Sequence, residues 1–212
     1  GQPFVAETPP GGVVAGQAFL TPLGNYNGPN IKAPSGHWKD GPLDFFALGI
    51  FSPHLWCAWC CTQCAMGQVM QRLRLDWLGR QATEHQSRNT FKVCVALVAS
   101  YTLFSYSLDY LSPSYEYSDM AQPPLWLEFL RNIGLLLFIS WSVYALSRTR
   151  AFVRAKYRIS EERCPGYEDV CCSLFCACCT VAQISRHTGE HETYRSVCCS
   201  ETGLPADAPM LV

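Results

Sequence analysis

Two cysteine clusters hold the side chains of this 212-residue chain that are best suited to chemistry. The first cluster runs from Cys57 to Cys64, and the second runs from Cys171 to Cys179, with Cys164 seven residues upstream. Closely spaced thiolates are the ligands that soft divalent ions such as Zn²⁺ and Cd²⁺ prefer. The spacing therefore favours a metal site, although it does not match that of a zinc finger.

The two clusters are copies of one pattern. When Cys64 is aligned with Cys179, both halves have cysteine at offsets −7, −3 and 0, a small residue at +3 and glutamine at +4. These residues are Cys57, Cys61, Cys64, Gly67 and Gln68 in the first half, and Cys172, Cys176, Cys179, Ala182 and Gln183 in the second. Offsets of −7, −3, 0 and +4 lie on one face of a helix. We therefore expect two helices, each with a stripe of thiols that ends in a glutamine.

The small residue at +3 would let a second helix approach closely, so we expect the two stripes to face each other. Two thiols from each stripe would then make one four-sulfur site. The principal candidate ligands are the six repeated cysteines, and Cys60, Cys164, Cys171 and Cys178 are lesser candidates. His187 and His191 lie four residues apart, but this pair is more typical of a solvated helix face than of a metal site.

Two other roles for the cysteines stay open. Cysteines next to a membrane are substrates for S-acylation, and Cys198 and Cys199 are suitable positions for it. Cysteine also packs as a small apolar residue in helical cores.

Two apolar stretches must position these clusters. Residues 91–111 contain 21 residues, and a helix of that length spans about 30 Å, the thickness of the hydrocarbon core of a bilayer. Residues 125–147 form a second stretch, in which Glu128 and Arg131 lie in the first two turns and can pair. The two stretches predict a transmembrane hairpin.

The charges around the hairpin predict its orientation. Between residues 93 and 147 the only basic residue is Arg131, whereas basic residues are frequent on both sides of the hairpin. The positive-inside rule then places both termini in the cytosol and the acidic loop of residues 112–124 outside. Cytosolic thiols stay reduced, so we do not expect a disulfide scaffold.

The remaining segments follow from composition. Residues 1–42 hold 8 Gly and 7 Pro, which predicts a disordered tail. Residues 43–198 would form the cysteine-rich membrane domain, and residues 199–212 a C-terminal tail. Leu55 to Trp77 reads as one helix, with an apolar stripe that favours a membrane surface. Whether the uncharged residues 45–70 form a third membrane segment stays open.

Composition also excludes some functions. The net charge is −1 and only 16% of the residues are charged, so a nucleic-acid partner is not expected. The chain contains no glycine-rich phosphate loop and no nucleophile elbow. We therefore expect a protein that is not an enzyme.

Several motifs resemble those of the placenta-specific-8 cysteine-rich family, which includes plant cadmium resistance proteins and cell number regulators. In the first half these are Trp38-x-x-Gly41-x-x-Asp44 and Cys64-x-x-Gly67-Gln68. In the second half the basic segment around Lys156, the cluster ending at Cys179, and Gln183-x-x-Arg186-His187 also fit. The clusters lack the Cys-Pro step that is common in the family. The resemblance implies a small α-helical membrane protein with a role in heavy-metal export or resistance, or in growth control.

Together these features predict an all-α membrane protein: a two-helix transmembrane hairpin flanked by two cytosolic or interfacial cysteine-rich helices. The expected function is binding of Zn²⁺ or Cd²⁺, with export by an oligomer, because two helices are too few for a pore. The alternative is a membrane-anchored interaction or regulatory protein with structural or acylated cysteines. The expected partners are the lipid bilayer and a second copy or another membrane protein, and the expected location is the plasma membrane.

Overall fold

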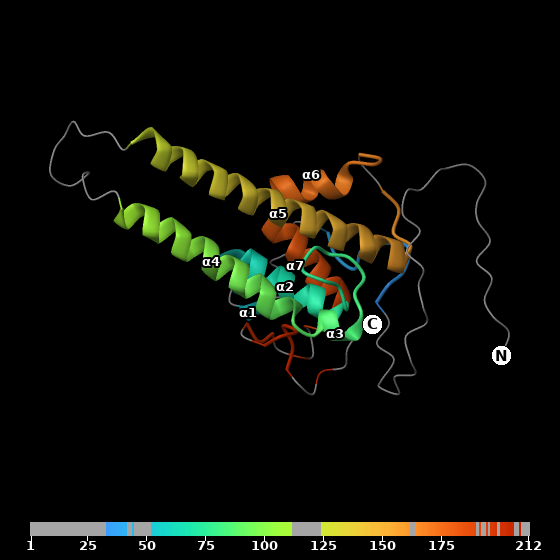
Figure 1. Cartoon of the computed structure of the whole chain (residues 1–212). Coiled ribbons are helices and arrows are strands. Elements are labelled where there is room, and N and C mark those ends of the chain that lie inside the picture. The colour runs from blue at the N-terminus through green and yellow to red at the C-terminus, as the bar shows by residue number, and fades with distance from the viewer. Residues whose placement is uncertain are drawn as a thin grey trace.

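The computed structural model describes residues 33–41, 44, 52–111, 124–161, 164–189, 191, 194, 196–198, 200–205 and 208. In these ranges the regular elements are helices, apart from one bridge between Leu75 and Gln81. The helices are α1 (Pro53–Cys60), α2 (Thr62–Arg72), α3 (Glu84–Ser87), α4 (Thr90–Tyr110), α5 (Leu125–Tyr157), α6 (Glu168–Phe175) and α7 (Ala177–Thr188) (Figure 1). The predicted all-α fold is thus confirmed.

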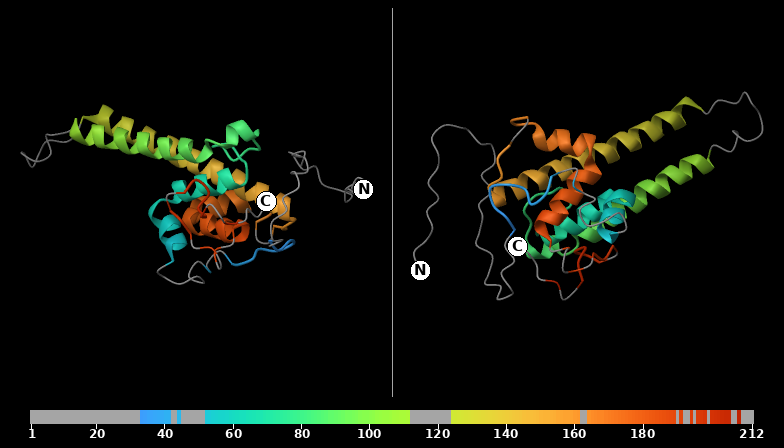
Figure 2. Two further views of the ribbon diagram at one scale, coloured as in Figure 1. Left: turned by 90° about the horizontal axis from the view of Figure 1, so that it is seen from below. Right: turned by 180° about the vertical axis from the view of Figure 1, so that it is seen from behind.

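Helices α4 and α5 run side by side and protrude from the other helices, which gather around the opposite end of this hairpin (Figures 1 and 2). Both are long and apolar enough to cross a membrane. Their apolar side chains are largely exposed, as for Leu103, which is 70% exposed. The Tyr101 and Phe138 rings stack at 4.3 Å, and an ion pair joins Arg131 to Asp109. The predicted pair of membrane-spanning helices is therefore present.

Helix α5 continues well beyond residue 147, where the predicted span ends. Its last turns are buried by α6, because Arg150 donates to Glu168 at 3.0 Å and Arg154 donates to Asp169 at 2.9 Å. The helix ends at Tyr157, and its C-cap residue Arg158 adopts a left-handed conformation with φ of 56°. The basic residues that follow the apolar stretch thus belong to the same helix and fasten it to the cysteine-rich half.

The core lies between α2, α4, α5 and α7. It is lined by Met66, Val69, Met70, Leu73, Cys94, Ala145, Leu146, Val153, Val181 and Ile184 among others. The apolar stripe of α2, interpreted from the sequence as membrane-facing, therefore points into this core. That interpretation was wrong because a helix that packs on other helices shows the same period as one on a lipid surface.

The single helix expected from Leu55 to Trp77 is also wrong. It breaks at Cys61 into α1 and α2, and α2 ends at Arg72. Arg74 then has a left-handed φ of 56°, and the Leu75 N–H donates to the Met70 carbonyl at 2.8 Å. Together with the Arg74 N–H, which donates to the Gln71 carbonyl at 3.1 Å, this makes a Schellman type of helix termination, here without glycine.

Two short segments beside the helices are held by hydrogen bonds. We call residues 33–41 the N-terminal segment and residues 196–198 with 200–205 the C-terminal segment. The N-terminal segment, which was predicted to be part of a disordered tail, donates from the Gly36 N–H to the Tyr157 carbonyl at 2.9 Å. The prediction for residues 1–32 lies outside the described residues, as do Cys199 and most of the loop between α4 and α5.

Candidate metal centre

Each cysteine cluster is folded into a helix–corner–helix unit. The corner residue is Cys61 between α1 and α2, and Cys176 between α6 and α7. Their backbones are nearly identical, with φ and ψ of −141° and 70° at Cys61 and −146° and 69° at Cys176. In both corners the cysteine N–H caps the first helix at 3.1 Å, and its carbonyl accepts the first bond of the second helix at 3.0 Å. The sequence repeat is therefore also a structural repeat.

The corners correct the prediction of a continuous thiol stripe. Cys57 and Cys172, at offset −7, belong to the first helix of each unit, whereas Cys64 and Cys179 lie in the first turn of the second helix. In the second unit the chain bends by 116° between α6 and α7. A helical spacing of cysteines therefore did not produce one helical face, because the backbone turns between offsets −7 and 0.

Two disulfides close the corners, one between Cys61 and Cys64 and one between Cys176 and Cys179. The argument from a cytosolic compartment predicted reduced thiols, so these bonds differ from that expectation. Each bond joins residues only three positions apart and therefore ties no distant parts of the chain together. Reduction would return each pair to the dithiol form that a metal ion requires.

The second corner gathers three sulfur atoms. The Sγ atoms of Cys176, Cys178 and Cys179 lie within 4.8 Å of one another. Cys176 is the N-cap residue of α7, and the other two are in its first turn. All three thus lie at the positive end of the helix dipole. The group is half-buried, with Cys179 the most enclosed.

The other candidate ligands stay apart from this group. Cys60 and Cys164 are exposed, and Cys171 and Cys172 are half-buried on α6. Among the residues that the structure describes, Cys61 and Cys64 form no group of three ligands with sulfurs of the second corner. The four-sulfur site expected from two facing stripes is therefore not assembled here.

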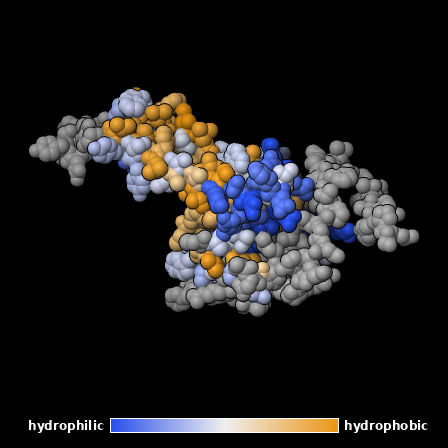
Figure 3. All heavy atoms as spheres, turned by 60° about the horizontal axis from the view of Figure 1, so that its bottom comes forward, coloured by the Kyte–Doolittle hydropathy of each residue, from blue (hydrophilic) through white to orange (hydrophobic). Residues whose placement is uncertain are grey.

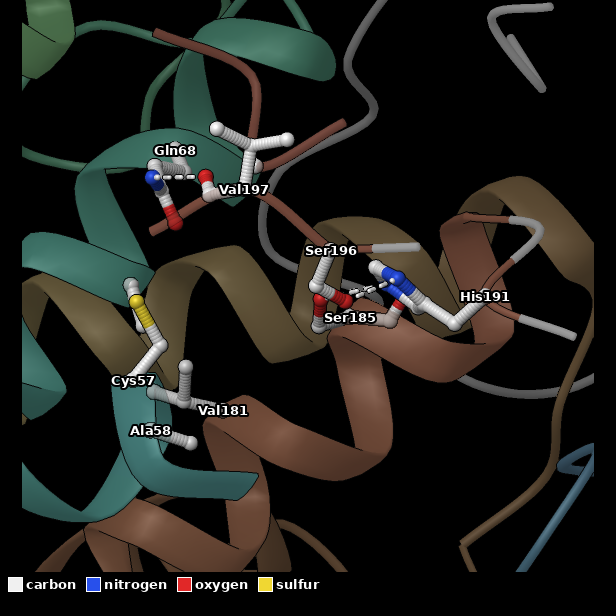
Figure 4. A pocket seen from close by; sticks show the side chains of 10 residues that line it. Cys57, Ala58, Gln68, Val181, Ser185, His191, Ser196 and Val197 are labelled. Atoms are coloured by element: carbon white, nitrogen blue, oxygen red, sulfur yellow. Dashed lines mark hydrogen bonds between the residues drawn. The ribbon is translucent and has the colours of Figure 1, made fainter. Parts of the chain in front are cut away.

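The repeated glutamines bind the terminal segments. Gln68 Nε2 donates to the carbonyls of Cys198 and Ser200, both at 2.7 Å, and also approaches that of Val197 (Figure 4). Gln183 Nε2 donates to the Asp40 carbonyl at 2.9 Å. Each unit thus uses the equivalent side chain to hold one end of the domain. The repeat indicated that these residues are special, but not which segments they hold.

The small residue at +3 does allow close helix packing, but with a different partner from the one expected. Gly67 packs against the membrane-spanning helix α4, where an added Cβ would lie 2.8 Å from Cys94 Cβ. A side chain at this position would push α2 away from α4. The first unit is therefore seated directly on the hairpin.

A buried polar cluster surrounds His187, which the sequence suggested was solvated but which is only 1% exposed. The Lys39 N–H donates to its Nδ1 at 3.2 Å, and the Trp38 and Tyr157 rings meet it edge-on at 5.2 and 4.6 Å. Burial, aided by the nearby His37 and Lys39 charges, lowers the pKa of His187 to about 4. The family-type residues Trp38 and His187 are therefore parts of one core.

Two arginines complete the links between the halves. Arg186 Nε donates to Asp40 Oδ2 at 3.0 Å, beside the Gln183 contact. Arg72 is 1% exposed and donates from α2 to Thr188 Oγ1 at 3.0 Å and to the Ser185 carbonyl at 3.2 Å. Burial lowers the pKa of Arg72 to about 10, so it is still charged at neutral pH. No pattern in the sequence had identified Arg72, since it resembled the other flanking basic residues.

A small pocket lies between α1, α2, α7 and the C-terminal segment (Figure 4). Its polar side consists of Ser185, His191 and Ser196, and the His191 ring bonds both hydroxyls, at 3.1 and 2.8 Å. The pocket has room for about one water molecule. This space is too small for an organic substrate.

The chain was compared with curated proteins, with solved structures and with models of protein families. The first two searches gave no match. The model of the PLAC8 family matches residues 38–187, which is more than half of the chain. The first and last matched residues, Trp38 and His187, contact each other in the buried cluster. The chain therefore belongs to the PLAC8 family.

Proposed function

We propose that this protein is an integral membrane protein that binds Zn²⁺ or Cd²⁺ at the α6–α7 corner. The observation that carries the proposal is the grouping of the Cys176, Cys178 and Cys179 sulfurs within 4.8 Å. With Zn–S bonds of about 2.3 Å, three sulfurs around one ion would be about 3.8–4.0 Å apart. The Sγ atoms of Cys176 and Cys178 are already 3.9 Å apart.

Metal binding requires the Cys176–Cys179 pair in its dithiol form. A cytosolic corner supplies that form, because the cytosol keeps thiols reduced. The basic residues at the domain end of the hairpin support this orientation, with both termini in the cytosol. A glycosylation acceptor inserted in residues 112–124 should be modified if this orientation is correct, and an unmodified acceptor would contradict it. We further propose that the membrane in which the protein is located is the plasma membrane.

The metal content of cysteine variants tests the proposed site. Reduced protein is purified in detergent, loaded with zinc, and its metal per chain is measured by mass spectrometry. We expect Cys178→Ser to lose most of the bound zinc, because a soft site tolerates loss of a thiolate poorly. Cys171→Ser is the matched control, because Cys171 is a half-buried neighbour outside the group of three. Equal zinc in wild type and both variants would contradict the site.

Export of the bound ion is the further step that we propose, and it requires an oligomer. Two helices enclose no channel by themselves, and the hairpin joins them by stacked rings and by the Asp109–Arg131 pair. Loss of entrapped cadmium from vesicles that contain the protein, measured as a function of protein density, tests this step. Retention of the ion at every density would contradict export.

The disulfides favour a second candidate function, a membrane-anchored interaction protein whose cysteines are structural. In that case the Cys61–Cys64 and Cys176–Cys179 pairs would serve to fix the corners. Exposed thiols such as Cys60 and Cys198 would then be open to S-acylation. Lipid that hydroxylamine releases, together with an absence of metal after full reduction, would select this function. For both candidates we propose a binding role rather than an enzymatic one.

A further inference from the structure

The first corner lies beside the membrane-spanning part of α5. Gln63, two residues after Cys61, donates from its Nε2 to Ser142 Oγ at 3.4 Å. Ser142 is six residues nearer the far end of the hairpin than Arg148, the first basic residue after the apolar stretch. At 1.5 Å per residue this corner therefore reaches about 9 Å beyond the level of Arg148.

The contacts between α2 and α4 also place the first corner beside the membrane-spanning part of the hairpin. The Phe91 N–H donates to Gln71 Oε1 at 2.9 Å, and Gly67 packs on Cys94. Lower residue numbers in α2 thus lie beside higher numbers in α4, further from Lys92. Cys61 precedes Gly67 by six residues. The corner therefore lies at most about 9 Å further from Lys92 along α4 than Gly67 does.

The second corner also lies beyond the level of Arg148. Helix α6 begins beside the basic end of α5, where Asp169 accepts from Arg150 at 3.3 Å and from Arg154 at 2.9 Å. It then runs toward the protruding hairpin (Figure 1). Its last residue, Phe175, follows Asp169 by six residues, which corresponds to about 9 Å. Measured from a level midway between Arg150 and Arg154, Phe175 is near the level of Leu146, about 3 Å beyond Arg148. Both corners lie at the edge of the domain from which the hairpin emerges (Figure 2).

The exposed side chains of both corners are apolar. Trp56 and Trp59 on α1 stack at 6.0 Å, and Trp59 is 62% exposed. On α6, Leu174 is exposed and Phe175 is 83% exposed. Residues 52–71 and 170–185 contain no Asp, Glu, Lys or Arg. Tryptophan and phenylalanine at such depths are typical of segments at the boundary between headgroups and acyl chains.

We propose that the two corners are wedges that insert into the leaflet on the domain side of the membrane, beside the hairpin. The occupant of these surfaces is lipid, because they continue the lipid-facing surface of α4 and α5. Figure 3 shows apolar side chains that cover the hairpin and extend onto the adjoining edge of the domain, whereas hydrophilic side chains gather further away. The combined α6–α7 pair is also apolar enough to be a broken or re-entrant span. This proposal does not depend on metal binding.

One consequence concerns the cysteines. The corner residues Cys61 and Cys176 are carried by the wedges, so their sulfur atoms lie at the cytosolic boundary of the membrane. An ion that reaches the three-sulfur group would then arrive along the membrane surface.

Thiol labelling at the two ends of α6 tests the wedge. Tyr167→Cys and Phe175→Cys place reporters at the start and the tip of the same helix, where both native side chains are exposed. Each variant is reconstituted in phosphatidylcholine vesicles and treated with a charged, membrane-impermeant maleimide or with an apolar pyrene maleimide. Labelled sites are located by tandem mass spectrometry and normalised to labelling in sodium dodecyl sulfate. Because both positions belong to one helix, the orientation of the chain in the vesicle affects them equally.

We expect the charged reagent to label Phe175→Cys at least about ten-fold more slowly than Tyr167→Cys, since it is excluded from the acyl-chain boundary. The apolar reagent should label Phe175→Cys at least as fast. For the first wedge, two exposed native cysteines serve as the corresponding pair. The charged reagent should label Cys60, beside the first corner, more slowly than Cys164. Equal rates with the charged reagent would overturn the proposal. Slow labelling of Phe175→Cys by both reagents would also overturn it, because that result indicates cover by protein rather than by lipid.

Discussion

Mild acid should lower the free energy of unfolding, because His187 takes up a proton in the unfolded chain but stays neutral in the folded protein. Its Nδ1 accepts a hydrogen bond from the Lys39 N–H, so the neutral ring carries its proton on Nε2. A second proton would abolish that bond and charge a side chain that is 1% exposed. Burial is the main reason why the pKa of His187 is about 4 in the folded protein, and the nearby His37 and Lys39 charges lower it further, against about 6.5 for a solvated histidine.

The magnitude follows from linkage between protonation and folding. Between pH 6.5 and 4 the unfolded chain binds a proton at His187 that the folded chain does not bind, so the free energy of unfolding falls as the pH falls. For these two pKa values the loss between pH 7.5 and pH 5.0 is about 2 kcal/mol. In a domain of this size it corresponds to about 4–8 °C in the unfolding midpoint.

The assay compares wild type with His187→Asn in detergent, using thermal unfolding followed by tryptophan fluorescence at both pH values. Asparagine can still accept the Lys39 hydrogen bond but does not titrate in this range. All other ionisable groups are shared, so the difference between the two pH dependences isolates His187. Wild type should lose about 2 kcal/mol more than the variant on acidification. Parallel losses would refute the argument that His187 is neutral because it is buried.

Two further predictions concern the contacts of the repeated residues. Gly67→Ala should destabilise the protein by about 1–3 kcal/mol, because the new methyl group meets Cys94 Cβ at 2.8 Å. In thermal unfolding, adding Cys94→Gly to the same chain should restore part of the lost stability. An absence of rescue would contradict this contact. Gln68→Leu should raise hydrogen exchange in the C-terminal segment alone and Gln183→Leu in the N-terminal segment alone, since each amide holds one segment; the same exchange pattern in both variants would contradict separate anchoring.

The hairpin could be predicted from the sequence because its signals are local. The length of the apolar stretches and the basic residues on either side reflect the thickness and the polarity of a bilayer. The full extent of α5 could not be predicted in this way, because its last turns are stabilised by α6. The ion pairs from Arg150 and Arg154 to Asp169 depend on a helix that follows later in the chain.

The corners show where periodicity misleads. Offsets of −7, −3 and 0 satisfy a helical repeat, and neither Cys61 nor Cys176 is next to a glycine or a proline that would mark a break. The backbone nevertheless turns at both residues. The repeat itself was informative, since it singled out Gln68 and Gln183 before any contact was known. Their partners could not be found from local pattern, because those segments lie more than a hundred residues away in sequence.

The most direct test of the central claim is X-ray absorption at the zinc edge on the reduced, zinc-loaded protein. If Cys176, Cys178 and Cys179 bind the ion, the nearest shell should consist mainly of sulfur at about 2.3 Å. The Cys178→Ser variant should lose sulfur from that shell, whereas Cys171→Ser should leave it unchanged. A nearest shell of only oxygen or nitrogen at about 2.0–2.1 Å in the wild-type protein would contradict a thiolate centre at this corner.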